Sequence, residues 1–81
     1  MSEREVVKEN AVYRHYGGGR YTVLFVASDS TNMRDGNEVV VYLSLSYGKI
    51  YCRDLVEFTE NVEWPDGSTR PRFILETEPA E

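Results

Sequence analysis

The side chains of this 81-residue chain that could do chemistry gather in one stretch, VYRHYGGGRY, residues 12–21. It holds the only histidine, His15, three of the six tyrosines and the longest run of glycines. An imidazole among phenols and guanidinium groups can bind an anion, a base or a peptide, and a glycine-rich loop can cradle phosphate. Phosphate loops, however, lead from a strand into a helix, whereas the residues after Gly19 are typical of a strand. The stretch therefore predicts a tight β-hairpin whose flanking side chains form a candidate pocket.

Nucleophilic catalysis is the second chemistry to consider, because the chain has one cysteine, Cys52, as well as one histidine. A thiol activated by an imidazole is a catalytic pair. Cys52 lies between Tyr51 and Arg53 in a predicted strand, so its side chain should point away from both and toward the interior. We therefore expect a buried structural thiol rather than a nucleophile, and one cysteine allows no internal disulfide.

A metal site would require His15 together with carboxylates at unrelated positions, because nothing in the chain follows the spacing of metal ligands. We expect no metal, no cofactor and no enzymatic activity. An accessory enzyme centred on His15 remains as an alternative.

The chain is acidic, with fourteen Asp and Glu against nine Lys and Arg and a net charge of −5. Nucleic-acid-binding proteins usually carry a basic surface, because neutralising phosphates supplies most of their affinity, so we expect no bulk nucleic-acid binding. No apolar run approaches the roughly 20 residues of a membrane-spanning helix, and residues 1–5 lack an apolar signal region. We therefore expect a cytoplasmic protein without a membrane partner. The sequence specifies no oligomeric state.

Alternating side chains predict the strands that position these groups. The strand over residues 21–27 places Tyr21, Val23, Phe25 and Ala27 on one face. The next strand covers residues 38–46 and has two different faces. The apolar face is predicted to be core and consists of Val39, Val41, Leu43 and Leu45. The semi-polar face is predicted to be surface and consists of Val40, Tyr42, Ser44 and Ser46.

The second half of the chain predicts a hairpin strand at residues 50–53, a helical turn within 54–61 that buries Leu55 and Phe58, a turn at 64–67 and a closing strand at 71–75. About five antiparallel strands with one short helical turn predict an all-β fold, first an SH3-like barrel and second an OB-like barrel. We expect a flexible N-terminal arm at residues 1–10, a single domain at 11–76 and a C-terminal tail at 77–81.

The order of these motifs resembles a widespread bacterial family of small proteins known as a domain of unknown function. Its signature runs approximately Y-R-H-Y-K-G-x-x-Y-x-V-L, A-x-H-S-E-T, V-V-Y, W-V-R-P-L-x-M-F and P-R-F. This chain has VYRHYGGGRYTVL, Ala27, VVVY, Arg53 ahead of Leu55 and Phe58, and Pro71-Arg72-Phe73 in the same order. The resemblance covers residues 12–75. It implies an SH3-like all-β fold and no established activity.

The chain departs from that signature at several polar positions. The lysine of the family is replaced within the glycine run, and the H-S-E-T segment aligns with Asp29, Ser30, Thr31 and Asn32. Tyr51 stands where the family has tryptophan. If the H-S-E-T group carries the function of the family, the resemblance implies that this chain has lost or altered it.

Four side chains form the candidate ligand-binding site on the semi-polar face of the predicted sheet. By the two-residue period, Tyr13 and His15 point to one side, where Tyr42 and Arg53 from later strands approach them. An imidazole, two phenols and a guanidinium suit a peptide or a small ligand. The alternative is a structural histidine that joins neighbouring strands, with Arg53 paired to Asp54, Glu57 or Glu60.

An acidic residue also recurs at every third position from Asp54 to Asp66, including Glu57, Glu60 and Glu63. The series predicts either a solvated rim or a negative strip that docks a basic partner. The sequence therefore leaves two functions open. The first is a non-enzymatic module that binds a peptide or small ligand, and the second is an acidic inhibitor of a larger enzyme or nucleic-acid-binding protein.

Overall fold

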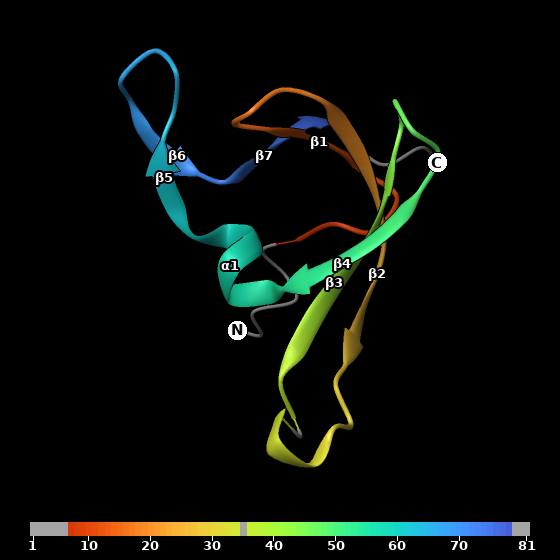
Figure 1. Cartoon of the computed structure of the whole chain (residues 1–81). Coiled ribbons are helices and arrows are strands. Elements are labelled where there is room, and N and C mark those ends of the chain that lie inside the picture. Colours follow the sequence, from red (N-terminus) through yellow and green to blue (C-terminus); the bar gives the residue numbers. More distant parts are fainter. Residues whose placement is uncertain (1–6, 35, 79–81) are drawn as a thin grey trace.

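The computed structural model describes residues 7–34 and 36–78, so residues 1–6 of the predicted arm and 79–81 of the predicted tail lie outside it. The chain is mostly β-strand (Figure 1). Its elements are β1 Val12–His15, β2 Arg20–Ser28, a 3₁₀ helix Asn32–Arg34, β3 Glu38–Ser44, β4 Ile50–Asp54, α1 Leu55–Thr59, β5 Asn61–Glu63, β6 Thr69–Pro71 and β7 Phe73–Thr77. The predicted all-β class is confirmed.

Five strands form one antiparallel sheet in the order β4-β3-β2-β1-β7, and β5 and β6 form a separate hairpin. The first four strands follow one another as a meander, and β7 returns to pair with β1 (Figure 1). In the described part of the chain, β4 and β7 do not pair with each other. The predicted barrel is therefore an open five-stranded sheet.

The glycine run closes the β1–β2 hairpin, as predicted. Gly18 and Gly19 have φ angles of 99° and 88°, a region that residues with a Cβ rarely adopt. The His15 N–H donates to the Gly19 carbonyl at 3.2 Å, and the Gly18 N–H donates to the His15 carbonyl at 2.9 Å. A phosphate-binding loop is excluded, because the glycines lead into β2 rather than into a helix.

The core lies on the face of β3 opposite to the predicted one. Val40, Tyr42 and Ser44 are 0%, 5% and 2% exposed, whereas Leu45 is 51% exposed. The three other residues of the predicted core face are only partly buried: Val39, Val41 and Leu43. The inversion occurs because α1 and the N-terminal segment supply Phe58, Leu55 and Val7 to the face that carries Tyr42.

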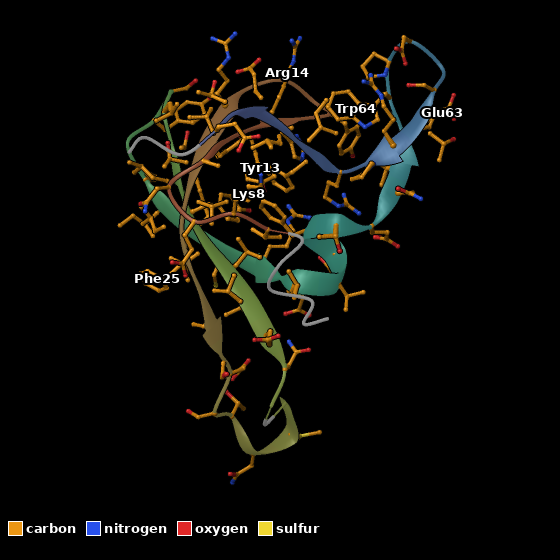
Figure 2. The ribbon with its side chains drawn as sticks, turned by 180° about the vertical axis from the view of Figure 1, so that it is seen from behind. Lys8, Tyr13, Arg14, Phe25, Glu63 and Trp64 are labelled. Atoms are coloured by element: carbon orange, nitrogen blue, oxygen red, sulfur yellow. The ribbon has the colours of Figure 1, made fainter. Side chains whose placement is uncertain are left out.

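A β-bulge in β2 explains a second difference. Val23 pairs with Tyr42, but Phe25 pairs with the next residue of β3, Val41, so the alternation shifts by one residue between them. Val26 consequently packs against the core, while Phe25 is 48% exposed and points away from the molecule (Figure 2). The prediction that Tyr21, Val23, Phe25 and Ala27 share a face is therefore wrong beyond Val23.

Cys52 is exposed rather than buried. It pairs with Val41 across β3 and β4, on the outer face of the sheet. The predicted alternation of Cys52 with its neighbours was correct, but the face it points to is not the interior. His15 follows Tyr13 by two residues on the core face, so the sheet separates the thiol from the imidazole and no Cys52–His15 pair forms.

The helical turn is where the sequence predicted it. α1 buries Leu55 and Phe58, which are 2% and 1% exposed. Phe58 stacks on Phe73 of β7 with ring centroids 4.0 Å apart, and this pair forms the centre of the core. Within the predicted arm, Val7 is 4% exposed, and the Asn10 N–H donates to the Val23 carbonyl at 2.7 Å. The described part of the arm is thus packed on the sheet.

The assignment of the buried face of β3 can be tested by the same substitution at two adjacent positions. We expect Val40→Ala to lower the free energy of unfolding by about 2 kcal/mol, because it removes two buried methyl groups and leaves a cavity. Val41→Ala changes strand propensity by the same amount, but the Val41 side chain is only partly buried. This substitution should therefore lower the free energy of unfolding by less than about 1 kcal/mol. Urea denaturation measures both, and equal losses would contradict the assignment of the faces.

Candidate functional site

Two of the four predicted site residues are core residues. Tyr13 is 4% exposed, and its hydroxyl accepts a hydrogen bond from the Lys8 N–H at 2.9 Å. Burial raises the pKa of Tyr13. Tyr42 makes edge contacts to the rings of Tyr21 and Phe73 at centroid distances of 5.4 and 5.3 Å. Neither ring is presented to solvent as a binding surface.

Arg53 is held by neighbours within the fold. Its guanidinium lies 5.9 Å from the centroid of the Phe73 ring and 3.7 Å from the Glu57 carboxylate. A hydrogen bond with the Tyr42 side chain raises the pKa of Arg53, and Glu57 adds to this effect. Glu57 is one of the nearby carboxylates that the structural alternative allows for Arg53.

His15 lies at the rim of the aromatic core. Its ring centroid is 4.8 Å from that of Phe73 and 4.7 Å from that of Tyr16. The Nδ1 atom accepts a hydrogen bond from the Gly17 N–H at 3.0 Å, so the proton of the neutral ring sits on Nε2. Burial lowers the pKa of His15, and the charges of Arg53 and Arg72 lower it further.

The structure therefore brings the four predicted residues together, but around buried rings. His15, Tyr42 and Arg53 all contact Phe73, and Tyr13 contacts Phe58, which stacks on Phe73. Among them, His15 also lines a surface cleft.

The lowered pKa of His15 predicts a pH dependence of stability. Because folding favours the neutral ring, the unfolded chain binds this proton more tightly. The stability conferred by neutral His15 is complete above the unfolded value of about 6.5 and is lost as the pH falls toward the lower value of the folded protein. We expect an NMR titration midpoint below 6.5, and a smaller loss of stability between pH 7.5 and 5 in His15→Gln. A midpoint at or above 6.5 would contradict the assignment.

The cleft has a volume of about 490 Å³ and lies between the β1–β2 turn and the β5–β6 hairpin. Tyr16 and Trp64 form its aromatic part, with ring centroids 6.5 Å apart. The remaining lining residues are Arg14, His15, Gly17, Gly18, Pro65, Asp66, Arg70 and Ile74. Figure 2 shows Arg14 and Trp64 at the same end of the molecule.

Trp64 anchors the β5–β6 side of the cleft. It is 6% exposed, and its indole N–H donates to the Pro71 carbonyl at 2.9 Å. The Arg70 guanidinium lies 4.6 Å from the centroid of the Trp64 ring and donates through Nε to the Ser68 hydroxyl. Arg70 Nη2 is 3.4 Å from the Asp66 carboxylate, so the stacked cation is also ion-paired. Hydrogen bonds from Ser68 lower the pKa of Asp66.

Arg14 on β1 supplies the opposite side of the cleft. It is exposed and pairs across the strands with Arg20, which is ion-paired with Glu76 at 2.6 Å. Within residues 7–34 and 36–78, Arg14 itself has no ion-pair partner. Like charges directly opposite each other destabilise a sheet, and here the Glu76 carboxylate compensates Arg20 rather than Arg14.

The acidic series does not form an uncompensated strip. Glu57 pairs with Arg53, and Glu60 pairs with Arg72 at 2.9 Å. Asp66 pairs with Arg70, as described above. Glu63 is exposed on β5 (Figure 2). Arginines thus pair with three acids of the series, two of them at a spacing of four residues and one, Glu60, across the fold.

In the described ranges, no three His, Cys, Asp or Glu side chains gather where they could hold a metal ion. The helices described in the structure are too short and too polar to cross a membrane.

Comparison with known proteins places the chain in a family. Residues 11–75 match DUF1653, described as a protein of unknown function. The chain belongs to this family. A crystal structure of a DUF1653 protein from Bordetella bronchiseptica is 29% identical and superimposes with a TM-score of 0.72, covering 96% of this chain and 97% of that one. No curated protein matches the chain. The predicted family membership is confirmed.

Sequence reasoning missed most of the cleft. The sequence pattern predicts Trp64 in a turn and indicates no site that includes Arg14 or Arg70. The available signal was the single tryptophan, Trp64, with Arg70 close to it in the sequence, since these residue types are enriched in binding sites. Trp64 and Arg70 line the same cleft as Arg14 only because two hairpins distant in the sequence lie together.

Proposed function

We propose that this DUF1653 protein is a non-enzymatic binding module that holds a small ligand or short peptide in the cleft between the β1–β2 turn and the β5–β6 hairpin. The observation that carries the proposal is the cleft itself, where two aromatic rings and two arginines converge. A volume of about 490 Å³ lies in the range of small-molecule sites. Tyr13 and Tyr42 belong to the core. His15 links the core to the cleft, because it contacts Phe73 and also lines the cleft.

A non-enzymatic role is supported by the separation of His15 and Cys52 on opposite faces of the sheet. Arg53, the fourth residue of the predicted site, is already engaged by Tyr42 and Glu57. Neither arrangement offers an activated nucleophile.

We further propose an SH3-like fold and a cytoplasmic location. The meander of β1 to β4, the short helix α1 and the return of β7 to β1 support the first. The single cysteine is consistent with a reducing compartment and supports the second. A role as an acidic inhibitor is less well supported, since Glu57 and Glu60 are paired with arginines.

Trp64 is the only tryptophan, so its fluorescence reports on the cleft directly. The test is a fragment screen that contains neutral, anionic and cationic aromatic compounds and short peptides. A hit should change the fluorescence of Trp64 and shift the amide signals of Tyr16, Gly17 and Gly18. If hits shift only signals outside the cleft, or if no fragment perturbs Trp64 at millimolar concentration, the proposed site is wrong.

A further inference from the structure

We infer that the ligand of this cleft carries a single carboxylate attached to an apolar or aromatic body. The inference rests on the proposed function and names the chemistry of the ligand that the site would take.

The charges that line the cleft sum to about one positive charge. Arg14 and Arg70 contribute two positive charges and Asp66 one negative charge, while His15 is neutral at pH 7 because its pKa lies below 6.5. Since the charge of Arg70 is paired with Asp66, and Arg14 has no ion-pair partner among the described residues, Arg14 supplies the uncompensated charge. A group with one negative charge balances it, whereas a doubly charged phosphate would also meet the repulsion of Asp66.

The hydrogen-bond donors of the cleft match a planar carboxylate. Guanidinium groups bind carboxylates through two parallel hydrogen bonds. Arg70 uses Nε and Nη2 toward Ser68 and Asp66, which leaves Nη1 as a donor. Its position is held by the Trp64 ring, so little side-chain entropy is lost on binding. Within the part of the chain that the structure describes, no ion pair engages the guanidinium of Arg14, which therefore supplies the second set of donors.

The contrast between Arg14 and Arg20, its partner across the strands, supports the same conclusion. Arg20 is neutralised by Glu76, but the structure supplies no carboxylate to Arg14 among the described residues. A ligand carboxylate would complete the pattern in which arginines of this molecule are paired, as Arg53 is with Glu57 and Arg72 is with Glu60.

The walls of the cleft favour an apolar body on the ligand. Pro65 and Ile74 contribute aliphatic surface, and Tyr16 and Trp64 contribute aromatic surface. Such walls bury apolar surface while the few polar groups fix the orientation of the ligand.

The carboxylate can belong to a free organic acid or to the C-terminus of a peptide, and both present the same chemistry to Arg14.

The experiment titrates the whole chain with five probes and follows Trp64 fluorescence and amide shifts. The probes are benzoate, the neutral isostere benzamide, phenyl phosphate, and N-acetyl-Ala-Phe with either a free or an amidated C-terminus. We expect benzoate to bind at least 10-fold more tightly than benzamide and more tightly than phenyl phosphate. Tight binding of only the free-carboxylate peptide indicates a peptide C-terminus as the source, and tight binding of only benzoate indicates a free acid.

The matched variants are Arg14→Gln and Arg20→Gln, which remove neighbouring arginines from the same face of the sheet. Loss of a charge-assisted hydrogen bond should weaken benzoate binding by roughly 10–100-fold in Arg14→Gln. Arg20→Gln should leave it within about 3-fold, because Arg20 does not line this cleft. Thermal melts confirm that both variants fold.

Failure of this inference is distinguishable from failure of the proposed function. If benzoate and benzamide bind in the cleft equally well, or if phenyl phosphate binds most tightly, the single carboxylate is wrong and the binding site stands. An unchanged benzoate affinity in Arg14→Gln also overturns the inference. If none of the probes perturbs Trp64, Tyr16 or Gly17, both conclusions fall.

Discussion

Truncation of Phe73 to alanine is expected to lower the free energy of unfolding by about 3–5 kcal/mol. Phe73 is 4% exposed and stacks on Phe58 at 4.0 Å. It also makes ring contacts with His15, Tyr21 and Tyr42. Removing the ring leaves a cavity between α1, β3 and β7. The cavity can close only if these elements move toward one another. Small domains have a total stability of about 5–15 kcal/mol, so a large fraction of it would be lost.

Phe25→Ala is the matched control, because it removes the same ring from the outer face of the sheet. Phe25 is 48% exposed beyond the β-bulge, so we expect a loss below about 1 kcal/mol. Chemical denaturation monitored by circular dichroism measures both variants. A comparable loss in the two would show that the stacked rings are not the centre of the core.

Truncation of Trp64 to alanine is expected to have the second largest effect, a loss of about 3 kcal/mol that is concentrated in one part of the chain. Trp64 is buried but lies outside the central cluster around Phe73. It holds β5 and β6 against Tyr16 and carries Arg70 on its face. We expect amide exchange to accelerate in residues 61–71 while the five-stranded sheet stays protected. The cleft loses one wall, so benzoate should no longer shift the amides of Gly17 and Gly18.

Trp64→Phe separates the ring from its hydrogen bond. The variant keeps an aromatic face for Arg70 but leaves the Pro71 carbonyl without the indole donor. We expect a loss of about 1 kcal/mol and a cleft that still binds. Uniform acceleration of exchange across β2 and β3 in Trp64→Ala would contradict a local role for this residue.

Several elements of the fold could be predicted from the sequence, since they depend on neighbours in the chain. The glycine run closes the β1–β2 hairpin because Gly18 and Gly19 adopt positive φ angles. The spacing of Leu55 and Phe58 places both on the buried side of a single helical turn. The strands β2, β3 and β4 occur close to where alternation predicted them. The order of these motifs also sufficed to place the chain in its family.

The side of the sheet that becomes the core could not be predicted in the same way. Alternation shows that Val40 and Val41 point in opposite directions, but it does not show which direction is inward. The sequence predicts the more apolar face of β3 as core, but the structure buries the other face because α1 and the segment containing Val7 pack there. A single bulged residue in β2 then turns Phe25 outward.

The candidate site depended even more on tertiary structure. Sequence alone determined that one histidine, one tryptophan and an excess of arginine over lysine were available. It placed His15 beside a hairpin, and that placement was correct. Only the fold brings the three-residue strands of the β5–β6 hairpin against the β1–β2 turn, and so joins Trp64 and Arg70 to Arg14. Contacts between residues some fifty positions apart arise from packing of whole elements, which local propensity does not encode.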